Sequence, residues 1–183
     1  MKDLSGKRIA ILLDNSGVEQ VELTTPWRAL ADAGAQTKLL APEKGTVQAF
    51  NNDVEKGDTF DADLAVGEAS GADYDGLVLP GGTTNADSLR MDSGAVGFVK
   101  EFAAAGKPIA AICHGPWTLV ESGVVEGKTL TSYPSLQTDI RNAGGTWVDE
   151  ESFTCTAQGF SLVTSRDPGD LDAFVEAAAD AFA

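Results

Sequence analysis

The sequence predicts an α/β protein in which a mainly parallel sheet is covered by helices on both faces. Short apolar runs recur along the chain, and those at 9–13, 75–79 and 109–112 are typical of strands buried on both faces. Between such runs lie segments whose apolar residues recur at helical spacing. Strands that alternate with helices favour right-handed βαβ units, and these units place helices on the two faces of one sheet.

The apolar pattern and the turn residues predict the elements in order. Gly34 and Pro42 end the first helix and the second strand, because glycine stops helices and proline interrupts pairing. The elements expected in the first half are a strand at 9–13, a turn at 14–17, a helix from 18 to Gly34, a strand at 36–41, a short hairpin or edge strands within 43–70, and a strand at 75–79.

The second half continues the alternation of strands and helices. Its expected elements are a helix at 93–105, a strand at 109–112, a helix to residue 121, a strand at 129–132, a helix at 135–143, a strand pair at 147–155 and 160–164, and a helix at 170–182. No linker or internal repeat interrupts this order, so residues 1–183 are expected to form a single domain.

Composition narrows the possible partners and the compartment. The formal net charge of -15 argues against nucleic acid or an anionic membrane as a partner. Its simplest interpretation is a well-solvated surface, and adaptation to high salt is the alternative. No secretory signal pattern is recognised at the start of the sequence, and two cysteines do not make a disulfide framework. We therefore expect a cytoplasmic protein.

The stretch around Cys113 is the strongest candidate for chemistry. Pro116 fits only the first turn of a helix, so the turn between strand and helix falls on Cys113 and His114. This arrangement has the shape of a nucleophile elbow with cysteine in place of serine. A thiol at the positive end of a helix is expected to have a lowered pKa, which favours the nucleophilic thiolate. A buried structural cysteine is the alternative, and that is the role expected of Cys155.

His114 is the only histidine in the chain, and this limits the possible bases. Either His114 itself is the base or no histidine is. Consecutive residues rarely aim their side chains at each other, so orientation of His114 by another chain is considered as well. No acid within the chain is strongly placed for it in the sequence.

Two further segments are expected at the same edge of the sheet, beyond the carboxyl ends of the strands. Glu19 and Glu22 lie three residues apart, on one helix face, and one of them could reach the thiol in protonated form. Solvated carboxylates near a helix N-terminus are the alternative. Gly81 and Gly82 follow a strand and could present N–H groups to an oxyanion together with the N–H of His114, although a Pro-Gly-Gly segment is often only a turn.

Five segments together resemble the PfpI-type intracellular protease family. They are residues 17–23, 73–82, 111–116, 131–136 and 164–171, and the likeness extends over essentially the whole chain. The resemblance implies a flavodoxin-like three-layer sandwich. It also relates the chain to the parkinsonism-associated deglycases, in the class I glutamine amidotransferase-like superfamily, whose members are described as cysteine peptidases, glyoxalases, deglycases, chaperones and stress proteins.

By position, the resemblance implies roles for several residues. Cys113 would be the nucleophile, Glu22 would contact its sulfur beside Glu19, and Gly82 and His114 would supply oxyanion N–H groups. Tyr133 matches a tyrosine near the pocket. In peptidase-like members the histidine pairs with an acid of a neighbouring subunit, and Asp87 occupies that loop position, where a glutamate is familiar.

These observations predict a cytoplasmic, cysteine-dependent stress enzyme. Its substrate would be a reactive aldehyde or an amide or peptide bond, and no metal or cofactor is expected. A homo-oligomer, at least a dimer, is expected because Asp87 would act across an interface. The alternative from another class is a redox sensor or holdase chaperone in which Cys113 is oxidised.

Overall fold

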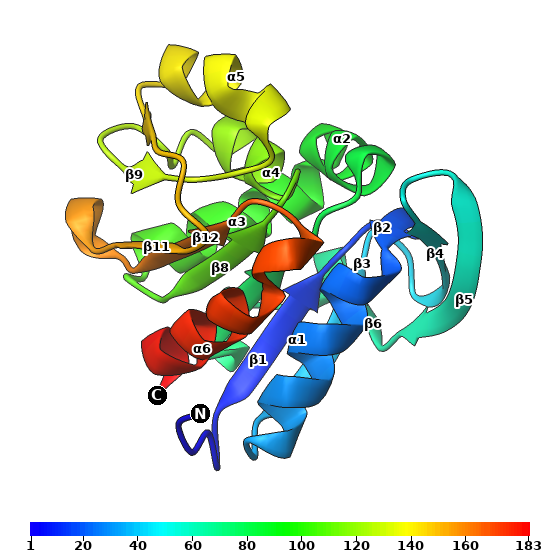
Figure 1. Cartoon of the computed structure of the whole chain (residues 1–183). Coiled ribbons are helices and arrows are strands. Elements are labelled where there is room, and N and C mark those ends of the chain that lie inside the picture. The colour runs from blue at the N-terminus through cyan, green and yellow to red at the C-terminus, as the bar shows by residue number, and fades with distance from the viewer.

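A seven-stranded sheet forms the centre of the computed structural model, which describes residues 1–183 (Figure 1). Its strands are β1 (Arg8–Leu12), β3 (Gln36–Ala41), β6 (Leu64–Ala65), β7 (Gly76–Leu79), β8 (Ile109–Ile112), β11 (Phe153–Cys155) and β12 (Leu162–Ser165). They lie in the order β11-β12-β8-β7-β1-β3-β6. Every neighbouring pair is parallel except β11 and β12, which are antiparallel. The predicted α/β class with a mainly parallel sheet is confirmed.

Helices cover both faces of this sheet and give three layers (Figure 1). The six α-helices are α1 (Gln20–Asp32), α2 (Thr83–Met91), α3 (Ser93–Ala104), α4 (Pro116–Glu121), α5 (Gln137–Asn142) and α6 (Leu171–Phe182). In β1, Ile9 and Ile11 pack in one core with residues of α1 and α6, whereas Ala10 and Leu12 pack in a second core with residues of α2 to α5. Alternate residues of one strand thus face the two helical layers, as expected for a strand buried on both faces.

Two small sheets stand beside the central one. β2 (Ser16–Glu19) pairs in parallel with β4 (Gly45–Asn51), and β4 pairs with β5 (Glu55–Ala62) as an antiparallel hairpin. The other small sheet joins β9 (Thr129–Leu130) to β10 (Thr146–Trp147). The hairpin expected within 43–70 is therefore confirmed. β2 was not expected, because its residues are typical of a turn.

Three sequence predictions differ from the structure. Residues 147–155 are not one strand: β10 pairs with β9, the segment 148–152 has no strand, and only β11 joins the central sheet. The strand expected at 129–132 stops at Leu130. The helix expected at 135–143 begins with a short 3-10 turn, Pro134–Leu136, before α5. In each case the regular strand or helix covers fewer residues than the apolar pattern suggests.

The acidic surface leads to a prediction about salt. The chain carries 28 acidic and 13 basic residues, and only four ion pairs link them. Most negative charges therefore repel one another without a partner, and salt at about 0.15 M shortens this repulsion to roughly 8 Å. We expect the melting temperature to rise as potassium chloride is added. Differential scanning calorimetry measures this, and a flat curve from low to molar salt would exclude adaptation to high salt.

Candidate active site

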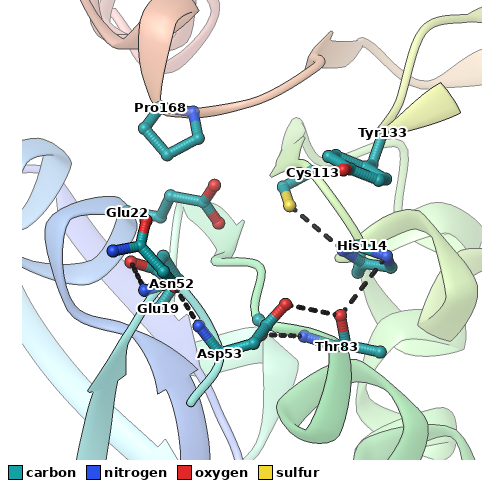
Figure 2. A pocket seen from close by; sticks show the side chains of 10 residues that line it. Glu19, Glu22, Asn52, Asp53, Thr83, Cys113, His114, Tyr133 and Pro168 are labelled. Carbon is teal, nitrogen blue, oxygen red and sulfur yellow. Dashed lines mark hydrogen bonds between the residues drawn. The ribbon is translucent and has the colours of Figure 1, made fainter. Parts of the chain in front are cut away.

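A pocket of about 330 Å³ lies at the carboxyl ends of the central strands (Figure 2). Its walls come from segments far apart in the sequence: Glu19, Glu22, Asn52, Asp53, Gly82, Thr83, Cys113, His114, Tyr133 and Pro168. Figure 2 shows Cys113, His114 and Tyr133 on one side and Glu19 and Glu22 on the other. The structure thus brings together most of the side chains that the sequence singles out. It contains no group of three histidine, cysteine or acidic side chains suited to a metal ion.

Cys113 occupies a strained turn between β8 and α4. Its φ is 62°, a left-handed conformation that costs about 1–3 kcal/mol for a residue with a side chain. Backbone hydrogen bonds hold the turn: the Cys113 N–H donates to Ser165 (3.1 Å), and the Tyr133 N–H donates to the Cys113 carbonyl (2.8 Å). A Cβ on Gly115 would lie 2.6 Å from the Leu79 carbonyl oxygen, so only glycine fits there. These features are those of the predicted nucleophile elbow.

The Cys113 thiol is more protected from ionisation than the sequence suggests. Burial raises the pKa of Cys113 well above its ordinary value. The backbone N–H groups of Gly82 and His114 lower this pKa, but by less. This direction is opposite to the lowered thiol pKa that the sequence predicts.

His114 lies directly beside the sulfur. Its Nδ1 lies 3.1 Å from the Cys113 sulfur. The imidazole stacks on Tyr133 with 4.6 Å between ring centroids and also packs against Trp117. Burial lowers the pKa of His114, so the ring is neutral near pH 7. The expectation that adjacent side chains would not meet was wrong, because the left-handed turn at Cys113 brings sulfur and imidazole together.

Glu22 lies in the first turn of α1 and is completely buried. Burial raises the pKa of Glu22 to about 8, so this carboxyl group holds a proton at neutral pH. The Cys113 thiol and the Gly81 N–H face it and lower its pKa in part. Neither carboxyl oxygen, however, meets a partner in hydrogen-bond geometry. A buried polar group without a partner is costly, and here it points into the pocket beside the sulfur.

Gly81 and Gly82 allow the loop after β7 to approach the elbow closely. A Cβ on Gly81 would collide with the Glu22 carboxyl group and lie 2.6 Å from the Cys113 Cβ. Gly82 has a φ of 93°, and a Cβ there would lie 2.7 Å from the Glu19 backbone nitrogen. The N–H groups of Gly82 and His114 donate to no backbone carbonyl and act on the Cys113 sulfur instead. Gly82 and His114 thus stay the candidates for oxyanion donors.

Glu19 does not face the sulfur. Its two carboxylate oxygens accept the N–H groups of Asn52 (3.0 Å) and Asp53 (3.1 Å) at the tip of the β4–β5 hairpin. Both of those residues are left-handed, with φ of 53° and 64°. Glu19 therefore holds the hairpin tip against the pocket.

Asp87 and Tyr133 lie farther out than the sulfur. Asp87 is exposed on α2 and is not among the residues that line the pocket of its own subunit. Tyr133 is 41% exposed at the pocket mouth. Asp53 and Thr83 also line the pocket, although the sequence did not point to them. They contact each other, and Thr83 contacts His114. The polar turn at 51–53 could have drawn attention to Asp53, but nothing in the sequence links it to an elbow sixty residues away.

Several known proteins are similar in sequence to this chain. The chain is 38% identical to general stress protein 18 of Bacillus subtilis, over 92% of this chain and 94% of the relative. It is 36% identical to deglycase PYRAB04690 of Pyrococcus abyssi, over 90% and 93% of the two chains. It is 34% identical to the putative cysteine protease YraA of Bacillus subtilis, over 92% and 94%.

Solved structures share the fold of this chain. Superposition on Drosophila melanogaster DJ-1beta gives a TM-score of 0.81 at 28% identity and covers 98% of this chain and 90% of the other. The model of the DJ-1/PfpI family matches residues 7–181. This agreement in sequence and fold identifies the chain as a member of the DJ-1/PfpI family.

Proposed function

We propose that the protein is a cysteine-dependent enzyme that acts on reactive aldehydes or on the adducts they form with amines. The observation that carries the proposal is the Cys113–His114 pair, 3.1 Å apart, inside a pocket of about 330 Å³. This volume is at the small end of ligand pockets, and the sulfur-bearing residue is only 7% exposed. A small aldehyde such as methylglyoxal reaches such a thiol more readily than a folded protein segment does.

In the first step the sulfur adds to the aldehyde, and each residue of the site has a separate role. His114 Nδ1 takes the proton of the Cys113 thiol while the sulfur attacks the aldehyde carbon, and a C–S bond forms. The carbonyl oxygen becomes an alkoxide, which the N–H groups of Gly82 and His114 stabilise. The neutral Glu22 carboxyl is a proton donor for an oxygen of the substrate. Overall, addition of water to methylglyoxal gives lactic acid, without an external oxidant.

Deglycation follows from the same chemistry. When the aldehyde carbon is bound to an amine nitrogen, water and the enzyme release the free amine together with the hydroxy acid. The name of the relative from Pyrococcus abyssi supports this activity. Attack on an amide or peptide bond uses the same thiol and donors, and the name of YraA supports it. The small pocket restricts that activity to extended or short peptides.

A redox sensor or holdase chaperone remains a second candidate, because the neutral Glu22 carboxyl could donate a hydrogen bond to an oxidised sulfur. The proposal for the protein as a whole includes a cytoplasmic location, which its two free cysteines support. It also includes a homo-oligomer, in which Asp87, exposed on α2, is available to a neighbouring subunit.

Turnover assays with purified protein distinguish these functions. We expect loss of methylglyoxal with formation of lactate, and little cleavage of fluorogenic peptides, because of the small pocket and the buried thiol. Mass spectrometry after mild peroxide treatment records oxidation of Cys113 in parallel. Peptide cleavage without aldehyde turnover would assign the protein to the peptidases. Stable oxidation of Cys113 without either activity would favour the sensor and contradict the proposal.

A further inference from the structure

Thr83 connects His114 to an acid of the same chain. Its hydroxyl oxygen lies 3.4 Å from His114 Nε2 and 2.7 Å from an Asp53 carboxylate oxygen. The other oxygen of Asp53 accepts the Thr83 N–H at 2.8 Å. Figure 2 shows this path running from the sulfur through the imidazole to the carboxylate. The sequence pointed to Asp87, and hence to a second subunit, as the source of the acid, whereas Asp53 supplies one within the subunit.

The direction of each hydrogen bond follows from the groups involved. An ionised carboxylate only accepts, so the Thr83 hydroxyl donates its single proton to Asp53. Its oxygen can then only accept from His114, which requires the proton of the neutral imidazole to be on Nε2. Nδ1 is left with its lone pair facing the Cys113 thiol, 3.1 Å away. This is the tautomer that can remove the thiol proton.

The β4–β5 hairpin fixes the position of the Asp53 carboxylate. Asp53 is exposed, so its charge is screened by water, and its effect on the ring comes from geometry more than from long-range attraction. The left-handed conformation of Asp53, its N–H bond to Glu19 and the two bonds from Thr83 fix the carboxylate. Ser135 also lies 3.4 Å from His114 Nε2, but its hydroxyl has no carboxylate partner and so does not select a tautomer.

We propose that Asp53, acting through Thr83, is a positioning residue that sets the tautomer of His114 for proton removal from Cys113. The proposal rests on the base role given to His114 under the proposed function. The tautomer itself exists in the resting protein without substrate, so it is measured independently of any activity.

The experiment uses nitrogen-15 NMR of the imidazole in the full-length protein at about pH 7.5. His114 is the only histidine, so every imidazole signal belongs to it. We expect the Nε2–H tautomer in the wild type. In Asp53→Asn the new amide donates to the Thr83 oxygen, because its carbonyl still accepts the Thr83 N–H. The Thr83 hydroxyl is then free to donate to Nε2, and the proton moves to Nδ1.

Two further variants separate the relay from general damage to the pocket. Thr83→Val removes the hydroxyl at nearly constant shape and is expected to give a mixture of tautomers, whereas Thr83→Ser keeps the hydroxyl and the wild-type spectrum. Methylglyoxal kcat is expected to fall roughly three- to tenfold in Asp53→Asn and Thr83→Val, the effect of one neutral hydrogen bond, with KM little changed. Asp61→Asn, on the same hairpin and equally exposed, is the charge-matched control.

Three results would overturn the proposal. The first is an Nδ1–H tautomer in the wild type, and the second is an unchanged spectrum in Asp53→Asn. The third is a change of tautomer in Asp87→Asn but not in Asp53→Asn, which would assign the acid to a neighbouring subunit. If the tautomers behave as expected but no variant changes turnover, the relay stands and the proposed base role of His114 fails.

Discussion

Cys113→Ser is expected to abolish turnover of methylglyoxal, by roughly a thousandfold or more. A hydroxyl group has a much higher pKa than a thiol, so at this site the serine oxygen is a far weaker nucleophile than the cysteine sulfur. The two side chains differ by one atom, so the left-handed turn and its backbone bonds should persist. Lactate formation and the melting temperature, measured on the same preparation, test both parts of the expectation.

Cys155→Ser is the matched control for that variant. Cys155 is also buried and also a free thiol, but it lies on β11, away from the pocket, where its sulfur accepts the Thr129 N–H at 3.4 Å. We expect its activity to equal that of the wild type. Equal turnover by Cys113→Ser and the wild type would remove Cys113 from the mechanism.

Glu22→Gln is expected to stabilise the fold increasingly as the pH rises from about 5 to 8. The folded protein keeps a proton on Glu22, whose pKa is raised to about 8, whereas the unfolded chain releases that proton near the ordinary glutamate pKa of 4.5. The native state therefore binds more protons in this range, and the free energy of unfolding of the wild type falls with pH. Because glutamine stays neutral at every pH, the variant does not lose this stability as the pH rises. At pH 8 the difference is on the order of 4 kcal/mol.

Urea unfolding of both proteins at several pH values measures this difference. Below about pH 4.5 the two curves should run parallel, because the carboxyl group is then neutral in both the folded and the unfolded states. Glu176→Gln, an exposed change of the same charge on α6, controls for the change in net charge. A constant difference between Glu22→Gln and the wild type from pH 5 to 8 would show that Glu22 is ionised in the folded protein.

The sequence predicts the framework of the site well because that framework depends on local signals. The apolar runs of β1, β7 and β8 are strands because only a strand buried on both faces needs an unbroken apolar run. The elbow follows from a proline that must begin a helix directly after such a strand. These two signals are enough to place Cys113, Gly81 and Gly82 at one edge of the sheet.

Features that depend on distant contacts could not be predicted. Helix α2 is mostly polar, and its buried Asn85 bonds the Pro80 and Gly81 carbonyls and the Asp14 N–H, which no periodicity reveals. The raised pKa of Cys113 results from burial by several segments. Asp53 reaches the pocket only because Glu19 fixes a turn more than thirty residues farther along the chain.

The pocket is built from two structural units, the central sheet and the small β2–β4–β5 sheet. Cys113, His114 and Gly82 belong to the central sheet and the loops that leave it. The opposite rim, Asn52 and Asp53, is carried by a hairpin that pairs with β2 and not with any central strand. Substitutions at the hairpin tip that keep Asp53 can therefore reshape substrate access while Cys113 keeps its place on the central sheet.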